Sequence, residues 1–356
     1  MMNCTCSNFS VGDEYNGFKV LKVFPVSDYH GTCFYLRHKI TGLDVLHLFC
    51  DDSENLFAFN FRTGNTKGNG AAHIMEHSVL CGSELFPLKD PFTRLSNQSV
   101  KTYLNAATYP DKTVYPASST NISDYFNLMK VYADAVFFPR LSEEVFFQEA
   151  CRLQLEKNDV PELQGVVYNE MKGNYSSFES VSYRVPFHHL LKSTIYEKDS
   201  GGDPVEIPGL TYEEYLDFHK TWYRPDNCLL FLYGNIPLFR QLDFLNDNFI
   251  KRLEKKYSPF EINGQEKNAE KFRELCESKK SLSKRKIHET GPGGENEKGE
   301  TVGKMSGYED YGATVILDIN CGAVEYQLPY VEDYIYFDRD KDCFVVNQQT
   351  FEDLRV

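Results

Sequence analysis

Short runs rich in aromatic and branched apolar residues dominate the first part of the chain, and polar residues separate them. The separating segments include Asp-Tyr-His-Gly, Thr-Gly and Asp-Asp-Ser-Glu-Asn, which are typical of turns. Runs of this length and composition favour β-strands. We therefore expect strands at residues 18–26, 32–40, 43–50 and 56–63, paired as an antiparallel sheet with one covered face.

Farther along the chain, apolar residues recur at helical spacing. A connection rich in Gly and Asn, residues 64–70, leads into a first helix, and Gly82 ends it because glycine just past the last turn is a common stop signal. Asp90 and Pro91 are suited to cap and begin a short helix at 89–94. The remaining expected elements are strands at 100–107, 112–118 and 228–234, and helices at 122–138, 142–156, 164–177, 181–192, 212–222 and 238–255.

The order of these elements predicts an α+β domain, residues 1–258, in which helices cover an antiparallel or mixed sheet. After it the composition changes to a stretch rich in Lys and Glu. We expect a charged, flexible linker there, at residues 259–305. An apolar run at 312–319 then predicts the start of a second domain, 306–356, which we expect to be incomplete.

Composition and charge exclude several classes of function for this chain. Of the 356 residues, 41% are hydrophobic and 14% aromatic, enough for a packed core. A formal net charge of −14 argues against a nucleic-acid partner, because phosphate binding needs a basic face. Apolar runs such as residues 228–233 are far shorter than a membrane span. The N-terminal residues resemble neither a secretory signal nor a transit peptide, so we expect a cytoplasmic protein with reduced cysteines.

The segment Gly70-Ala-Ala-His73-Ile-Met-Glu76-His77 carries the clearest candidate chemistry. On a helix, His73 and His77 lie one turn apart on the same face, and Glu76 lies between them on that face. Two imidazoles at this spacing can bind one metal ion, and the glutamate is placed to take a proton from a water on that metal. This H-x-x-E-H order is the inverse of the commoner H-E-x-x-H zinc motif.

A catalytic zinc site needs a third protein ligand and an open position. The segment Gly165-Val-Val-Tyr-Asn-Glu170-Met-Lys-Gly173 stands out as its source. Glu170 lies beside an apolar helix face, where a carboxylate is a poor structural choice unless something pairs with it. The alternatives are structural: histidines satisfied in the core, Glu76 in a salt bridge and Glu170 at the surface. We expect packing roles for His188, His189, His219 and Cys81.

Three segments together resemble the M16 (pitrilysin/insulysin) family of zinc metallopeptidases. Within that family the chain looks most like the N-terminal part of the presequence-protease branch, which includes the falcilysin-like enzymes. The resemblance covers roughly residues 15–240. The three segments are His73-Ile-Met-Glu-His77-Ser-Val-Leu-Cys-Gly-Ser83, Leu104-Asn-Ala-Ala-Thr-Tyr-Pro-Asp111 and Gly165-Val-Val-Tyr-Asn-Glu-Met-Lys-Gly173.

The resemblance implies a zinc-dependent endopeptidase. One zinc ion per chain would be held by His73, His77 and Glu170, with Glu76 as the general base. Family members act on short unstructured peptides, which they enclose in a chamber between two halves of the enzyme.

The resemblance also implies how the peptide binds. It would add as an extra strand along an edge strand, through main-chain hydrogen bonds that tolerate many sequences. That edge strand would be formed by Leu104, Asn105, Ala106 and Ala107.

Two functional hypotheses follow. The first is a zinc endopeptidase, or its N-terminal catalytic portion. The second is a truncated, non-catalytic M16-like chain or subunit that binds zinc and a peptide or partner chain without cleaving. An intact H-x-x-E-H motif with Glu170 favours the first, because a scaffold has no use for Glu76. The short C-terminal part favours the second, since the family's second half closes the chamber and contributes an Arg and a Tyr; a separate chain could replace that half.

Overall fold

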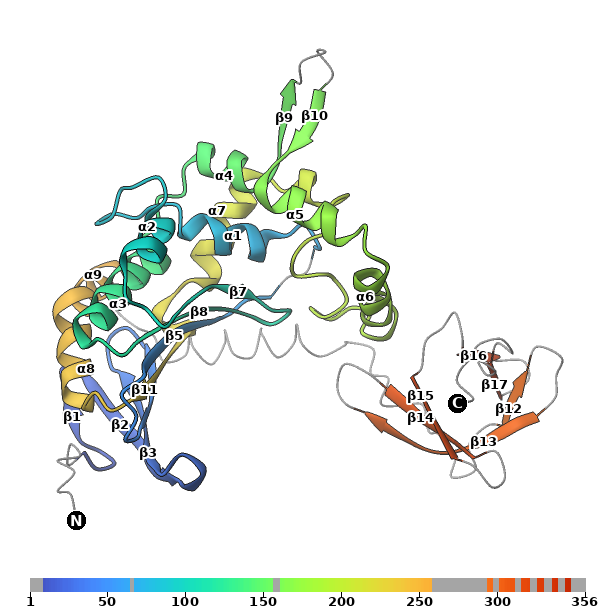
Figure 1. The fold of residues 1–356 in the computed structure, drawn as a ribbon, viewed down its shortest axis with the longest axis horizontal. Coiled ribbons are helices and arrows are strands. Elements are labelled where there is room, and N and C mark those ends of the chain that lie inside the picture. The colour runs from blue at the N-terminus through green and yellow to red at the C-terminus, as the bar shows by residue number, and fades with distance from the viewer. Residues whose placement is uncertain are drawn as a thin grey trace. The chain divides into compact units, whose positions relative to one another are not determined.

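A computed structural model gives the fold (Figure 1). It describes residues 9–64, 67–155 and 161–257, together with strand segments at 293–296, 301–310, 315–320, 325–329, 335–338 and 343–346. The chain divides into two compact units. The first comprises Met1–Gly173 and Asp199–Arg273, and the second comprises Asn174–Lys198 and Glu274–Val356.

A mixed sheet forms the centre of the first unit. Its strand order within the described residues is β1-β2-β3-β4-β11-β5-β8-β6, and β7 pairs with β8. β11 runs parallel to β4 and antiparallel to β5, which makes the sheet mixed. The strands are β1 (Glu14–Tyr15), β2 (Phe18–Val26), β3 (Gly31–His38), β4 (Asp44–Phe49), β5 (Asn55–Arg62), β6 (Tyr103–Leu104), β7 (Ala107–Thr108), β8 (Lys112–Ser119) and β11 (Cys228–Gly234).

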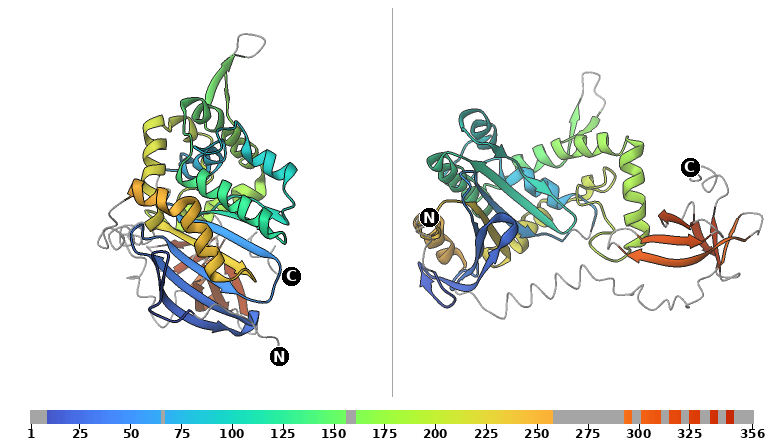
Figure 2. Two further views of the ribbon diagram at one scale, coloured as in Figure 1. Left: turned by 90° about the vertical axis from the view of Figure 1, so that its left-hand side faces the viewer. Right: turned by 60° about the horizontal axis from the view of Figure 1, so that its bottom comes forward.

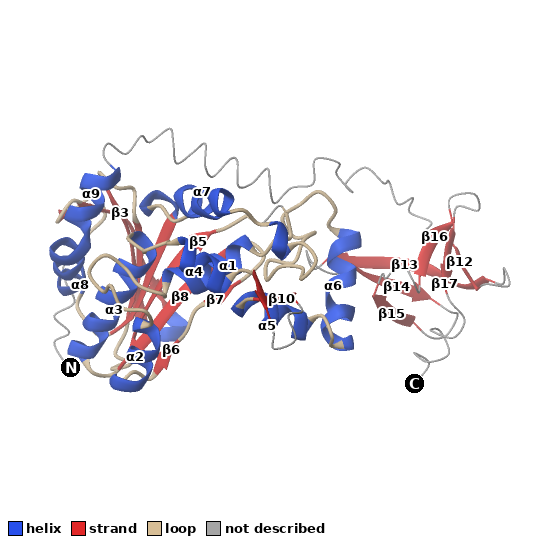
Figure 3. Cartoon of the chain, turned by 90° about the horizontal axis from the view of Figure 1, so that it is seen from above, coloured by secondary structure: helices blue, strands red, loops and turns tan. Residues whose placement is uncertain are grey.

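Helices of the first unit pack on this sheet and beside its β7 end (Figures 1 and 3). α3 contacts β5 and β8, whereas α1 contacts β7, α4 and α7. The helices are α1 (Ala71–Val79), α2 (Pro91–Gln98), α3 (Ile122–Phe137), α4 (Glu143–Glu149), α5 (Val166–Asn174), α7 (Tyr212–Trp222), α8 (Leu238–Leu245) and α9 (Lys251–Tyr257). The predicted α+β class is therefore confirmed.

Aromatic side chains fill the core between α3 and the sheet. Phe57 of β5 is fully buried, and the rings of Tyr125 and Tyr132 on α3 each approach it edge-on at 5.6 Å between centroids. Phe59 and Phe137 make a similar contact at 6.0 Å. These alternating inward positions of β5 explain why a run of Phe residues predicted a strand with one covered face.

Most of the predicted elements are confirmed, and β2, α7 and β11 have the predicted bounds. Three predicted helices differ clearly from the structure, and the one expected at 164–177 is shorter, at Val166–Asn174. The helix expected at 142–156 ends at Glu149, and the chain turns into the antiparallel hairpin β9 (Arg152–Leu155) with β10 (Pro161–Gln164), which projects from the first unit (Figures 1 and 2). Leu153 and Leu155 alternate with the polar residues Arg152 and Gln154, a pattern typical of a strand. The prediction instead extends the helical spacing of the preceding apolar residues to residue 156. The helix expected at 238–255 is interrupted by a π-helical segment, Asn246–Ile250.

The second unit contains α6 (Phe178–Leu190) and a separate sheet with strand order β15-β14-β13-β12-β17-β16. Two of its strands, β12 and the first part of β13, fall inside the stretch predicted as a charged linker, because a Lys- and Glu-rich composition does not prevent backbone pairing. The rest of that predicted linker lies mostly outside the described residues. The strands are β12 (Gly293–Asn296), β13 (Thr301–Asp310), β14 (Val315–Asn320), β15 (Glu325–Pro329), β16 (Ile335–Asp338) and β17 (Cys343–Val346). Among the described residues, no helix has the length and apolar character needed to cross a membrane.

Buried neutral histidines make the first unit sensitive to acid. Burial lowers the pKa of His47 to about 3 and that of His38 to about 4, from 6.5. Within the described part of the chain, neither ring nitrogen of His47 has a hydrogen-bond partner. An unfolded chain therefore binds protons that the folded chain excludes as the pH falls from about 6.5 towards 4, and each such histidine costs about 1.4 kcal/mol of unfolding free energy per pH unit.

We expect the free energy of unfolding, measured by urea denaturation, to fall between pH 7 and pH 5. In His47→Phe the fall should be smaller, since the aromatic side chain fills the space between Phe34 and Phe49 without a titrating group. Replacing the exposed His30 by Asn serves as the control and should leave the fall unchanged. An equal fall in His47→Phe and the native chain would contradict this assignment.

Candidate metal centre

A close approach of backbone segments fixes the start of α1. Gly70 precedes the helix with a left-handed φ of 71°. A Cβ on Gly202 would lie only 2.6 Å from the Cα of Gly70, so only glycine fits there without displacing the backbone. This contact holds the loop at Gly201 and Gly202 against the N-terminal end of α1, where His73 lies on the first turn.

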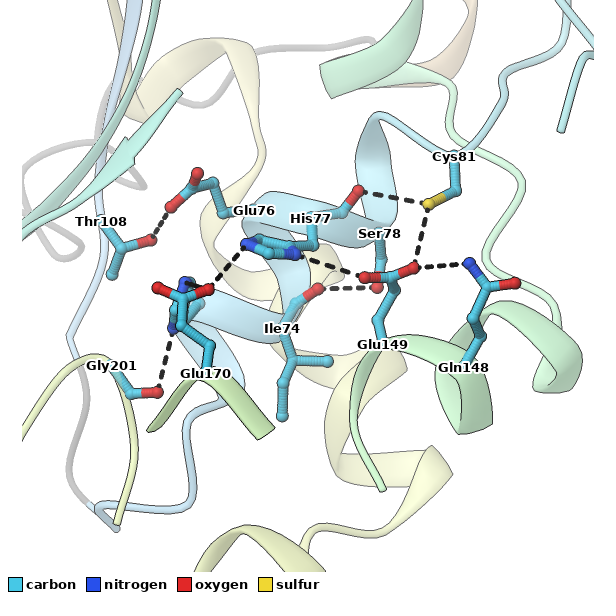
Figure 4. A network of polar contacts seen from close by, with 11 residues as sticks. Ile74, Glu76, His77, Ser78, Cys81, Thr108, Gln148, Glu149, Glu170 and Gly201 are labelled. Atoms are coloured by element: carbon cyan, nitrogen blue, oxygen red, sulfur yellow. Dashed lines mark hydrogen bonds and ion pairs between the residues drawn. The ribbon is translucent and has the colours of Figure 1, made fainter. Parts of the chain in front are cut away.

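The two histidines of the motif lie one turn apart on α1. Figure 4 shows the ring of His77 between the carboxylates of Glu170 and Glu149. The ring centroids of the two histidines are 4.8 Å apart and the ring planes are nearly perpendicular, at 87°. His73 is buried, and His77 is partly exposed. Both are held on a helix whose other face is packed, so neither ring needs a large rearrangement to bind a common ligand.

Glu170 reaches this pair from α5. Its Oε2 atom lies 3.7 Å from Nε2 of His73 and 3.9 Å from Nε2 of His77. One ligand atom from each of the three residues falls within 4.8 Å of the others, the only such group of His, Cys, Asp or Glu found among the described residues. The side chain of Glu170 is 48% exposed and that of His73 only 11%, so the group opens towards solvent on its Glu170 side.

The opposite nitrogen of each imidazole is engaged by the protein. Nδ1 of His73 lies 3.1 Å from the carbonyl oxygen of Gly201, and Nδ1 of His77 lies 3.3 Å from Oε2 of Glu149. A carbonyl oxygen and a carboxylate accept hydrogen bonds, so both Nδ1 atoms donate. In the neutral form of each ring this leaves the lone pair on Nε2, the atom that faces Glu170, and imidazole binds a metal through such a lone pair.

Glu149 lies at the C-terminal end of α4 with only 4% of its surface exposed. Burial alone would raise the pKa of its carboxyl, but hydrogen bonds from His77 and Gln148 outweigh burial and hold that pKa below the usual value. Burial alone would lower the pKa of His77, but the hydrogen bond to Glu149 and the nearby carboxylates of Glu76 and Glu170 outweigh burial and raise that pKa. Glu149 thus remains an anion that orients the His77 ring.

Glu76 occupies the neighbouring position on α1, also buried. Its Oε2 atom accepts a hydrogen bond of 2.7 Å from the hydroxyl of Thr108 on β7. This contact fixes the carboxylate at the side of the helix nearest the sheet edge. Within the described residues, no hydrogen bond to the other oxygen, Oε1, is found, so this oxygen could accept a proton from a group beside it.

The donor set fits zinc. Two imidazoles and one carboxylate, with an open side towards solvent, are a common ligand set of catalytic zinc. His77 and His73 each have the outer hydrogen-bond acceptor that such ligands usually have.

The predicted edge strand is present but interrupted. β6 and β7 pair with β8 in one continuous register, with Leu104 opposite Ala117 and Ala107 opposite Val114. Between them lie Asn105 and Ala106, which belong to neither strand, so one unbroken strand over 100–107 is wrong. The cause is Pro116 on β8, which accepts a hydrogen bond from the Asn105 amide but has no N–H to return.

Sequence reasoning missed Glu149, Thr108 and the Gly201 carbonyl. Glu149 and Thr108 are 72 and 32 residues away from their partners on α1, and neither has a distinctive local pattern. Thr108 lies within the segment Leu104–Asp111 that carries the family resemblance, but the predicted edge strand ends one residue before it, at Ala107. The packing role predicted for His219 is borne out, since its Nε2 bonds the Val136 carbonyl at 2.9 Å in a buried position.

Glu149→Ala is expected to weaken zinc binding by about 10- to 100-fold, because the His77 ring loses the acceptor that orients it. Glu149→Gln, which retains an acceptor oxygen, should weaken it less. Competition with a chromophoric chelator measures both affinities. Glu143→Ala, an exposed glutamate on the same helix, is the control. Equal affinities in Glu149→Ala and the control would show that Glu149 does not orient the ligand.

Comparisons with known proteins agree with this architecture. Two family models match the chain: Insulinase (Peptidase family M16) at residues 62–181, and the Peptidase M16 inactive domain at residues 209–318. A solved structure, a protease from Helicobacter pylori, has a similar fold with a TM-score of 0.50 and 17% identity, over 64% of this chain and 49% of that one.

Curated relatives match at higher identity. Protein HypA of Clostridium perfringens is 44% identical over 261 residues, 72% of this chain and 27% of that protein. The mitochondrial presequence protease of Xenopus laevis is 42% identical over 248 residues, 68% of this chain and 24% of that protein. The chain spans about a quarter of the length of these relatives. Both the family models and the relatives place the chain in one group: it belongs to the M16 family of peptidases.

Proposed function

We propose that the chain is a zinc-dependent endopeptidase, or the catalytic portion of one, that hydrolyses short unstructured peptides. The observation that carries this proposal is the convergence of His73, His77 and Glu170, whose ligand atoms lie within 4.8 Å of one another. Glu76 lies on the same helix beside them, with its carboxylate oriented by Thr108. Membership of a peptidase family supports the same reaction class.

In this proposal each residue has a distinct task. His73, His77 and Glu170 hold the ion, and Glu149 and the Gly201 carbonyl keep the two imidazoles in the binding tautomer. Zinc, when bound, supplies Lewis-acid chemistry that makes water nucleophilic near neutral pH. Glu76 removes the proton of the attacking water at Oε1 and transfers it to the leaving amine of the peptide.

The peptide would bind along the open edge of the sheet. In an antiparallel pair, successive residues face alternately towards and away from the neighbouring strand. Because the Asn105 amide faces Pro116, the backbone groups of Leu104, Ala106 and Thr108 face away from β8, towards the edge. A substrate strand could hydrogen-bond to these groups, and Thr108 also touches Glu76, which would place the scissile bond near the base.

The test is cleavage of a quenched fluorescent peptide by the purified chain, with metal content determined on the same sample. The proposal predicts one zinc per chain and cleavage that a chelator abolishes and zinc restores. One zinc per chain without cleavage would favour the second hypothesis, a zinc-binding M16-like chain that does not cleave by itself. A chain that takes up no zinc would overturn the proposal.

A further inference from the structure

A buried tyrosine reaches the interrupted part of the edge strand. Tyr132 lies on α3 with its side chain fully buried, and its hydroxyl donates a hydrogen bond of 3.1 Å to the carbonyl oxygen of Asn105. Burial raises the pKa of Tyr132, so the hydroxyl keeps the proton that it donates. Asn105 lies in the gap between β6 and β7, where the ladder with β8 fails.

The Tyr132 hydroxyl donates its hydrogen bond where an amide proton on residue 116 would otherwise donate one, and Pro116 has no amide proton. A constant register pairs Leu104 with Ala117 and Ala107 with Val114, which sets Asn105 opposite Pro116. The Asn105 amide donates to the Pro116 carbonyl at 3.2 Å. In a regular ladder the amide of the opposite residue would donate back to the Asn105 carbonyl, but proline has no amide proton. The Tyr132 hydroxyl occupies that role instead.

We propose that Tyr132 is a positioning residue for the peptide: its hydroxyl replaces the missing Pro116 amide and holds residues 104–108 extended. The inference rests on the proposed function, because residues 104–108 are the segment to which the substrate strand would add. Without the hydroxyl, the Asn105 carbonyl has no donor on the sheet side, and the segment can turn away from the extended conformation. The backbone groups of Ala106 and Thr108 would then meet a peptide less often in the correct orientation.

Tyr125 is a matched control. It lies on the same helix, is fully buried, and approaches the same Phe57 ring at the same 5.6 Å as Tyr132. Its hydroxyl, however, donates to Oε1 of Gln241 at 3.2 Å, away from the edge strand. Tyr125→Phe and Tyr132→Phe therefore both remove one buried hydroxyl from one helix, but only the second removes a hydrogen bond to residues 104–108.

The experiment compares the two variants by amide hydrogen exchange of residues 103–108 and by steady-state cleavage of the quenched peptide. In Tyr132→Phe we expect faster exchange in that segment and a KM about two- to tenfold higher, the range for loss of one hydrogen bond, with kcat within about twofold of the native value. Tyr125→Phe should change neither quantity. If Tyr132 had only a structural role, Tyr132→Phe would lower the stability of the fold or the rate of cleavage, and the change would not be confined to KM.

A rescue variant sharpens the test. Pro116→Val in the Tyr132→Phe background restores an amide that can donate to the Asn105 carbonyl, so exchange and KM should return towards the native values. Unchanged exchange of residues 103–108 in Tyr132→Phe would overturn the proposal whether or not the chain cleaves peptides. Faster exchange with an unchanged KM would overturn the substrate role while leaving the proposed function intact. Failure of the native chain to bind or cleave any peptide would contradict the proposed function itself and remove the substrate role with it.

Discussion

Glu76→Gln is expected to lower kcat/KM for peptide cleavage by about 10²- to 10⁴-fold, the contribution typical of a general base. Glutamine has nearly the same shape and can still accept the hydrogen bond that Thr108 donates to Oε2, so the site should keep its geometry. It cannot take up a proton at neutral pH. Zinc content should therefore equal that of the native chain while cleavage is nearly lost, as measured by metal analysis and peptide kinetics on one preparation.

Comparing Thr108→Val with Glu76→Gln separates the loss of the proton-accepting carboxylate from the loss of the contact that orients it. This change removes the hydroxyl that orients Glu76 but keeps the carboxylate, so the loss of kcat/KM should be smaller than in Glu76→Gln. Cleavage that persists at a near-native rate in Glu76→Gln would mean that another group acts as the base. A loss in Thr108→Val as large as that in Glu76→Gln would instead point to damage of the site as a whole.

Glu170→Ala is expected to weaken zinc binding by more than the roughly 100-fold that loss of an outer hydrogen-bond partner can cause, because a direct ligand is removed. The side chain is 48% exposed, so the fold should survive the change. Chelator competition measures the affinity, and circular dichroism checks the fold.

Glu162→Ala provides the matched charge change. Glu162 is an exposed glutamate on β10, so zinc affinity in this variant should equal that of the native chain. Native zinc affinity in Glu170→Ala would mean that the carboxylate does not bind the ion and that the third ligand lies elsewhere.

The sequence was most informative where structure depends on neighbours along the chain. The helix that carries His73 and His77, its glycine start and the strands around β11 follow from local periodicity and turn residues. The α+β class followed in turn from the order of these elements. Glu170 could be singled out because a carboxylate beside an apolar helix face needs a partner.

The rest depends on contacts between distant segments, which local patterns do not encode. Glu149 reaches His77 from 72 residues away, and nothing in its own surroundings distinguishes it from other helical glutamates. The break at Asn105 required knowledge of which residue lies opposite, since Pro116 disrupts the ladder only through register. The same holds for Tyr132, whose hydroxyl donates to the carbonyl of Asn105, 27 residues earlier in the chain.

Anomalous diffraction at the zinc edge, on crystals of the chain grown with zinc, would test the central claim most directly. The account predicts one strong peak between the Nε2 atoms of His73 and His77 and a carboxylate oxygen of Glu170, with Glu76 close by but not bound to the ion. A peak ligated by other residues, or the absence of any peak at this group in zinc-loaded crystals, would contradict it.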